Sequence, residues 1–301
     1  MPSKLQSAME YLMTYGWAIL IIAVVLGALF QLGIFNASTF TPKAPPGACH
    51  VFRPNGPNTV SFINLQGICN GELPQYAAQF SGSSTISIAK LTGMQALSYG
   101  GSSKITIVAW ANPSIIAAYY TIASYNAGAQ PSMEFGPDSG CSGNYYLDVI
   151  YATSISYESA CLYGSLVPTN QYSFFVFGFD GTHIIQYAGI NGHLYTNTVS
   201  ATLAFSIPAA SPFMIGGSAG SGGSNWKGQI SNVQIYNTTL SSNEITALYN
   251  GGIGAAPVQL NNLVGWWPLN GDTKDYSGNN NNGVPSGVTF TSNWESGYSA
   301  P

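Results

Sequence analysis

The pattern of apolar and polar positions divides the chain into an unbroken apolar run near its start and a long region of alternating character. Residues 11–35 are mostly apolar and carry no formal charge. A helix of about 25 such residues is roughly 37 Å long, which is enough to cross a bilayer. From about Tyr76 onward, short apolar runs alternate with polar and turn residues, as in β-strands. The pattern therefore predicts one N-terminal apolar helix followed by a mainly β region.

The β region holds a series of strand candidates, separated by turn signals such as Asp180-Gly181, Asn191-Gly192 and the glycine-serine loop at residues 216–224. Their spacing suits a sandwich or a jelly roll. The candidates are Thr85–Ile88, Lys104–Ala111, Tyr145–Tyr151, Tyr172–Phe179, Ile184–Ile190, His193–Thr198, Pro212–Ile215, Gln229–Tyr236, Leu263–Leu269 and Val288–Phe290. Before this region, the otherwise irregular stretch from Cys49 to Pro74 contains one short strand candidate, Val60–Ile63.

One short helix is expected after these strands. Ser241-Ser242-Asn243-Glu244 is a capping box, and Asn250-Gly251 supplies the stop. Within the β region, Trp110, Phe175 and Phe177 lie at strand spacing and are expected in the core.

The apolar run near the N-terminus admits more than one interpretation. An ordinary secretory signal has a shorter apolar core and a small-residue cleavage site, whereas Asn36-Ala37-Ser38 makes only a weak one. A plain single-pass anchor explains the length, but not the polar head Gln6-Ser7-Ala8-Met9-Glu10 that precedes the run. A carboxylate at the edge of a membrane-spanning segment is energetically unfavourable unless it has a positive partner, so Glu10 is a candidate functional residue.

This head resembles the archaeal class III signal peptide of type IV pilin-like proteins. The resemblance implies that a prepilin peptidase cuts between Leu5 and Gln6, which removes residues 1–5 as a leader and leaves residues 6–40 as a pilin-like helix. Glu10 would then pair with the new amine of Gln6 in a neighbouring subunit, because a carboxylate in a water-poor filament core requires a positive partner. A plain anchor, with Glu10 marking the interface, and a removed signal peptide remain the alternatives.

Composition supports an exposed location outside the cell. Charged residues make up 6% of the 301 positions, against about 25% in ordinary soluble proteins. Hydroxyl and amide residues, glycine and tyrosine take their place, which suits an extracellular surface. The net charge is -4 with no basic cluster, so nucleic-acid binding is not expected. We expect a membrane-inserted precursor that ends in an extracellular filament or at the cell surface.

The four cysteines are expected to form disulfides, since export places them in an oxidising space. Of three possible pairings, Cys49–Cys69 with Cys141–Cys161 is favoured, because each bond closes a local loop. The first lies in residues 41–75, which are interpreted as a proline-rich linker with a disulfide loop. Asn36 and Asn237 begin glycosylation sequons.

Residues 76–301 resemble the laminin G-like, concanavalin A-like β-sandwich. The matching phrases are Phe80–Ser84, Ile105–Trp110, Asp180–Thr182, Gly228–Tyr236, Leu240–Ile245, Trp266–Gly271 and Asp275–Asn279. The Trp-Pro-Leu phrase normally opens such a domain, and here it comes last, so the resemblance implies a circularly permuted sandwich. We expect residues 260–301 to close their own sandwich beside Gln229–Tyr236, with Trp266 or Trp267 buried, rather than to insert into a neighbouring subunit.

The arrangement of acidic residues in the sequence favours a binding protein over an enzyme. Glucanases on related sandwiches need two carboxylates facing one sugar bond, usually in a Glu-x-Asp-x-x-Glu pattern that this sequence lacks. Glu134 and Asp138 are four residues apart, and Glu158 is isolated. The three histidines, His50, His183 and His193, are scattered and are interpreted as surface or edge residues.

No cofactor is expected other than Ca²⁺, which many laminin G-like domains bind on a rim loop. Asn270, Asp272 and Asp275 offer oxygen ligands for it. The alternative is that residues 275–278 form a turn held by side-chain bonds to its own backbone.

These inferences predict an extracellular, pilin-like subunit of a type IV pilus-like filament, structural and adhesive, with a lectin-like domain that binds glycans or a surface. The alternative is a single-pass, membrane-anchored lectin that does not polymerise.

Overall fold

The computed structural model describes residues 3–31, 42–117, 120–125, 132–138, 141, 145–151, 157–218 and 224–301. The chain separates into two compact units, Met1–Pro42 and Lys43–Pro301. Each unit is described by itself.

The first unit contains the predicted apolar helix, α1 (Ser3–Gln31). Its stretch Met13–Gln31 has a mean hydropathy of 2.2, is not buried anywhere, and is long and apolar enough to cross a membrane. The residues expected at the cleavage and assembly site, Leu5, Gln6 and Glu10, belong to α1, but their side chains lie outside the described part of the structure. Asn36 lies outside the described residues altogether.

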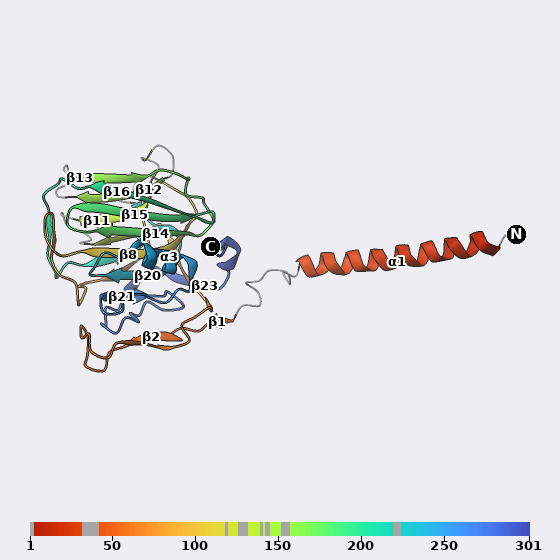
Figure 1. Cartoon of the computed structure of the whole chain (residues 1–301), viewed down its shortest axis with the longest axis horizontal. Coiled ribbons are helices and arrows are strands. Elements are labelled where there is room, and N and C mark those ends of the chain that lie inside the picture. The colour runs from red at the N-terminus through yellow and green to blue at the C-terminus, as the bar shows by residue number, and fades with distance from the viewer. Residues whose placement is uncertain are drawn as a thin grey trace. The chain divides into compact units, whose positions relative to one another are not determined.

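The second unit is a sandwich of two large antiparallel sheets (Figure 1). The seven-stranded sheet has the order β13 (Tyr157–Leu162), β12 (Tyr145–Tyr151), β11 (Ser132–Asp138), β10 (Ala123–Tyr125), β18 (Phe213–Ile215), β6 (Thr85–Ile88) and β22 (Val284–Ser286). The eight-stranded sheet has the order β16 (His193–Ser200), β15 (His183–Ile190), β14 (Ser173–Phe179), β8 (Ile105–Pro113), β20 (Lys227–Tyr236), β5 (Ala77–Ser81) and β23 (Thr289–Thr291), with β21 (Leu263–Trp267) also on β20.

Short elements complete the unit. They are the strand pairs β1 (Lys43–Ala44) with β4 (Leu73–Pro74), β2 (Cys49–Phe52) with β3 (Asn64–Gly67), β7 (Leu97–Ser98) with β17 (Ser206–Ile207), and β9 (Tyr120–Thr121) with β19 (Ser224–Asn225), the helix α3 (Ser242–Asn250) and the 3₁₀ turn η1 (Glu295–Gly297).

The main core lies between the two sheets. Ile86 and Phe135 from one sheet and Phe175 and Phe177 from the other belong to a single buried cluster. Alternation along each strand sends every second side chain into this layer, which explains why the sequence pattern located most of the strands.

A second core covers the outer face of the eight-stranded sheet. Trp110 and Phe174 point away from the first core and pack with Leu248 and Tyr249 of α3. The predicted capping box holds the start of this helix, since Ser241 and Glu244 each bond the other's backbone. Trp110, Phe175 and Phe177 are all buried, as predicted, although Trp110 belongs to this outer layer.

The C-terminal strands close their own sandwich, as predicted. β21 runs antiparallel to β20, with Trp267 opposite Val233, while β22 pairs with β6 and β23 with β5. Trp266 and Trp267 retain only 4% and 0% of their exposure. In Figure 1 the blue β21 lies between β20 and the orange β2.

Residues 43–75, interpreted above as a linker, fold onto the sandwich. The Cys49–Cys69 disulfide ties β2 to the chain beyond β3, and the second predicted bond, Cys141–Cys161, is also present. The strand expected at Val60–Ile63 is wrong: Phe62 has φ +56°, a turn conformation that a strand does not contain, and the strand begins only at Asn64.

Candidate functional site

Three adjacent strands place amide side chains in one line across the outer face of the eight-stranded sheet. Gln229 of β20 lies directly opposite Gln79 of β5 on one side and Asn112 of β8 on the other. Opposed residues share a face and lie close together. The amide of Asn112 donates to Gln229 Oε1 over 3.3 Å, and Gln79 Nε2 donates to the carbonyl oxygen of Gly228 over 3.1 Å. We call these three residues the amide row.

A cavity of about 180 Å³ lies over the amide row, and we call it the polar cleft. Its lining carries amides, hydroxyls and glycine but no charge: Gln79, Asn112, Ser114, Asn170, Gln229, Asn293, Ser296 and Gly297. A Cβ atom on Gly297 would come within 2.6 Å of Asn112 Nδ2, so the glycine leaves room for the amide. Such a lining can exchange hydrogen bonds with a neutral, polyhydroxylated ligand.

A second cavity of about 320 Å³, the aromatic pocket, also opens on this outer face. It is lined by Trp110, Gln171, Tyr172, Gly189, Asn191, Gly192, Tyr249, Ser299 and Ala300. The Tyr249 ring stacks on Trp110 with centroids 6.1 Å apart. A Cβ atom at Gly189 would approach that ring to 2.3 Å, so glycine is needed for Tyr249 to lie against β15.

The turn between β15 and β16 supplies the polar edge of the aromatic pocket. Asn191 has φ +51° and is followed by Gly192 at φ +80°, which is the two-residue turn that Asn-Gly predicts. The side chain of Gln171 donates from Nε2 to Asn191 Oδ1 over 3.0 Å. This bond holds two amides together at the mouth of the cavity.

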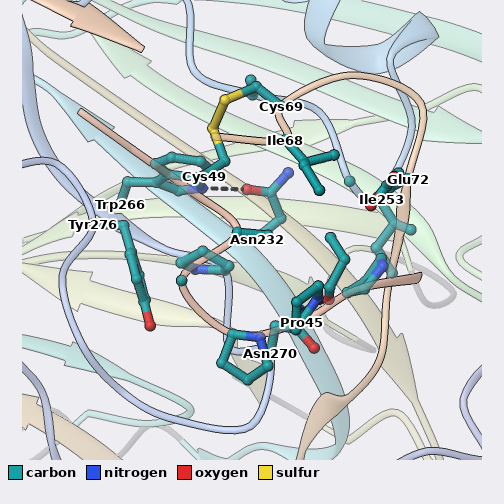
Figure 2. A pocket seen from close by; sticks show the side chains of 18 residues that line it. Pro45, Cys49, Ile68, Cys69, Glu72, Asn232, Ile253, Trp266, Asn270 and Tyr276 are labelled. Carbon is teal, nitrogen blue, oxygen red and sulfur yellow. Dashed lines mark hydrogen bonds between the residues drawn. A yellow bond between two sulfur atoms is a disulfide. The ribbon is translucent and has the colours of Figure 1, made fainter. Parts of the chain in front are cut away.

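A smaller pocket of about 50 Å³ lies where residues 44–49 and 68–74 meet residues 253–276 (Figure 2). Its walls include the Cys49–Cys69 disulfide, Ile68, Ile253 and several prolines. Trp266 Nε1 donates to Asn232 Oδ1 over 2.8 Å, the bond that Figure 2 marks between them. The small volume and the mostly apolar lining indicate a packing seam between the N-terminal and the C-terminal segments of the second unit.

The predicted calcium ligands are used as structural acceptors and donors at this seam. Asn270 Oδ1 accepts from the Tyr76 amide over 2.8 Å, and its Nδ2 donates to the Ala44 carbonyl. Asp272 Oδ2 accepts from the Tyr276 hydroxyl over 2.9 Å.

Asp275 accepts four hydrogen bonds from residues on both sides of it. Oδ1 takes the amides of Trp266 and Ser277, and Oδ2 takes the Ser277 hydroxyl and the Asn281 amide, at 2.8–2.9 Å. Burial raises the pKa of this carboxyl, while these donors lower it. The loop therefore has the geometry of the self-bonded turn considered as the alternative. Within the described ranges, no group of three or more His, Cys, Asp or Glu residues is arranged to hold a metal ion.

The carboxylates considered for hydrolysis lie on β11 and β13 of the seven-stranded sheet. Glu134 is 5% exposed, lies opposite Ser124 of β10 and accepts from the Ser218 hydroxyl over 2.8 Å. Burial raises the pKa of Glu134 above its usual range. Asp138 is buried on the same strand, whereas Glu158 accepts from the Thr202 amide over 2.5 Å.

Other predicted residues lie at the surface. His50 and His193 are exposed and His183 is half-buried, as predicted. Asn237 follows β20, is half-buried, and donates from its side chain to the Gly93 carbonyl over 3.1 Å. A glycan on that nitrogen would replace this bond.

Sequence reasoning missed Arg53, which is 9% exposed and donates to four carbonyl groups. Its partners are the carbonyls of Thr59, Leu260, Leu263 and Ser277, at 2.9–3.0 Å. Burial lowers the pKa of the guanidinium, and the nearby Asp275 charge raises it. The sequence feature that could have pointed to it is that Arg53 is the single arginine in a chain with only 7 Lys and Arg residues.

Comparison with solved structures finds chains of similar fold at low sequence identity. A heptameric SAP-like pentraxin from Limulus polyphemus aligns with a TM-score of 0.51 at 14% identity, covering 72% of this chain and 94% of that one. A protein from Bacteroides ovatus described as carbohydrate-binding aligns with a TM-score of 0.49 at 17% identity, covering 77% and 64%. The CBM40 module of a Ruminococcus gnavus IT-sialidase aligns with a TM-score of 0.40 at 18% identity, covering 48% of this chain and 82% of that one.

No curated protein sequence matches this chain. A family profile does match: residues 81–246, more than half of the chain, fit Laminin G 3, described as the concanavalin A-like lectin/glucanases superfamily. The match spans β6 through the first residues of α3, which includes most strands of the two large sheets. The chain therefore belongs to the concanavalin A-like lectin/glucanases superfamily.

Proposed function

We propose that this protein is a pilin-like surface subunit that displays a glycan-binding sandwich outside the cell. The observation that carries the proposal is the combination, in one chain, of an apolar helix with no buried residue in Met13–Gln31 and a lectin-superfamily domain. The helix provides attachment, and the domain provides binding.

The exposed helix supports attachment. A surface helix of a water-soluble domain normally keeps one polar face, whereas Met13–Gln31 is apolar on every side. Such a helix needs lipid or other helices around it. The spacing from Gln6 to Glu10 favours packing with other copies in a filament, after a prepilin peptidase has released the Gln6 amine.

The uncharged cavities support glycan binding. Amide, hydroxyl and aromatic groups line the polar cleft and the aromatic pocket, and no Lys, Arg, Asp or Glu is among the described lining residues. Neutral sugars present hydroxyls and apolar ring faces, which such linings complement. A single-pass anchored lectin that does not polymerise is the second candidate, because the same helix satisfies it.

The test combines filament and ligand measurements in the native host. Mass spectrometry of sheared filaments is expected to find this protein with Gln6 as its first residue. Glu10→Gln is expected to insert into the membrane but to lower filament yield, with Glu72→Gln, outside the helix, as the matched control. Protein found only in the membrane fraction with Met1 retained would favour the anchored lectin. Failure of the full-length chain to bind any neutral glycan on an array would remove the binding half of the proposal.

A further inference from the structure

We propose that the aromatic pocket is the saccharide site and that it takes one end unit of a neutral oligosaccharide. The inference rests on the glycan-binding function proposed above and assigns it to a place. The pocket volume of about 320 Å³ lies at the small end of the usual range for ligand sites, about 300–1,000 Å³. A small ligand, such as a single sugar unit, matches that size.

Two buried donors in the lining have no hydrogen-bond partner among the described residues. Trp110 is 2% exposed and Tyr172 is 4% exposed, yet within the described ranges neither the indole nitrogen nor the phenol hydroxyl makes a hydrogen bond. Buried polar groups in native proteins are nearly always paired, and an unpaired one is unfavourable. Both residues line the same cavity. Ligand hydroxyl groups would satisfy them, since a hydroxyl accepts as well as donates.

The mouth of the pocket offers the complementary exposed groups. The bond from Gln171 Nε2 to Asn191 Oδ1 orients both amides and leaves Gln171 Oε1 as an acceptor and Asn191 Nδ2 as a donor for a ligand. Acceptors and donors therefore surround an aromatic interior. This combination fits a sugar, which carries hydroxyls around an apolar ring face.

The absence of charge narrows the class of ligand. The described lining residues include no Lys, Arg, His, Asp or Glu, and the titratable ones are Tyr172 and Tyr249. Burial raises the pKa of both hydroxyls, so they stay neutral at physiological pH. A phosphate, sulfate or carboxylate sugar would find no counter-charge there, and a neutral one needs none.

The outer wall explains how a ligand reaches the deep donors. Each donor atom has less than 1 Å² of exposed surface. Ser299 and Ala300, which complete the wall, are exposed and belong to no helix or strand. This wall can shift outward without breaking a sheet bond.

The polar cleft is the competing site, and the observations favour the aromatic pocket. In the amide row, Asn112 bonds Gln229, and Gln79 bonds two carbonyl groups. Its lining includes no aromatic residue among those described. In the polar cleft, the amides of the amide row already form hydrogen bonds within the protein. In the aromatic pocket, the buried indole nitrogen of Trp110 and the hydroxyl of Tyr172 form none within the described ranges.

The experiment uses the full-length chain in detergent micelles and an array of neutral oligosaccharides ending in glucose, galactose or mannose. The tightest binder is then titrated by calorimetry against variants. Tyr172→Phe removes one hydroxyl and is expected to weaken binding about tenfold, with an unchanged or raised melting temperature, because an unpaired group is lost. Asn191→Gly keeps the left-handed turn and is expected to weaken binding by a similar factor.

Asn112→Ala tests the competing polar cleft. Tyr99→Phe, which removes a hydroxyl from a tyrosine that lines neither cavity, is the matched control and is expected to bind like the parent chain. If Tyr172→Phe and Asn191→Gly bind normally while Asn112→Ala does not, the glycan function stands and the assignment to the aromatic pocket is overturned. If the parent chain binds none of the glycans, the function and this inference fall together. A loss confined to Tyr172→Phe and Asn191→Gly, with melting temperatures preserved, supports the assignment.

Discussion

Replacing Trp267 by alanine tests whether the C-terminal strand completes the core. The side chain is fully buried between the sheets and stacks on Phe213, with ring centroids 5.6 Å apart. Removing a buried Trp or Phe side chain typically lowers the free energy of unfolding by about 3–5 kcal/mol. The indole nitrogen also donates to the Asn281 carbonyl over 2.9 Å, and leaving that carbonyl unpaired adds about 1 kcal/mol.

The expected loss is therefore about 4–6 kcal/mol. For a domain of this size, 1 kcal/mol lowers the melting temperature by about 2–4 °C, so Trp267→Ala is expected to melt roughly 10–20 °C lower. The assay is a circular dichroism melt of the fragment 43–301, which contains the whole compact second unit, with both disulfides oxidised.

Val60→Ala is the matched control, because Val60 is 67% exposed and surface changes usually stay within about 0.5 kcal/mol. A melting temperature for Trp267→Ala within 2–3 °C of the parent fragment, corresponding to about 1 kcal/mol, would show that the C-terminal segment is not packed between the sheets.

Three further predictions concern single contacts. Because burial raises the pKa of Glu134, the folded state binds a proton at this carboxyl more readily than the unfolded state does. The stability that Glu134 contributes is therefore lost as the pH rises through the folded-state pKa. In urea titrations, Glu134→Gln should raise the unfolding free energy of the fragment at pH 7 and make that free energy less dependent on pH. The double variant Cys49→Ser, Cys69→Ser opens the loop that the disulfide closes between residues 20 apart. It should lower the unfolding free energy, measured by urea denaturation, by roughly 3 kcal/mol. A urea midpoint equal to that of the parent fragment would contradict the argument that the disulfide lowers the entropy of the unfolded chain. Arg53→Met leaves four carbonyl groups without their donor. At about 1 kcal/mol for each unpaired carbonyl, it should lower the unfolding free energy by about 4 kcal/mol; a loss below about 1 kcal/mol would show that water replaces the guanidinium.

The apolar helix and the regular strands were predictable because each repeats one simple pattern. β6 and β12 occur with the expected bounds, and the capping box of α3 is local to four residues. β11 was missed because its sequence contains Pro137 and two acids, yet every residue of it is buried. Its burial depends on neighbouring strands and loops, which the local pattern does not encode.

The candidate site was less predictable than the fold. The aromatic pocket draws residues from β8, the approach to β14, the turn after β15, α3 and the C-terminal tail. Only the order and register of the strands bring Trp110, Tyr172 and Asn191 to one cavity. The turn at Asp275 was foreseeable as an alternative to a metal site, because its bonding partners are mostly close in sequence.

The late position of β21, β22 and β23 in the chain has a consequence for when the sandwich can fold. β5 and β6 are made early, but β23 and β22, which cover their outer edges, come some 200 residues later along the chain. A ribosome adds only about 5–20 residues each second, so both sheets keep an open edge for many seconds of synthesis. The sandwich therefore cannot complete both sheet edges until nearly the whole chain has emerged, and the pairing of its last strands is the final step of its folding.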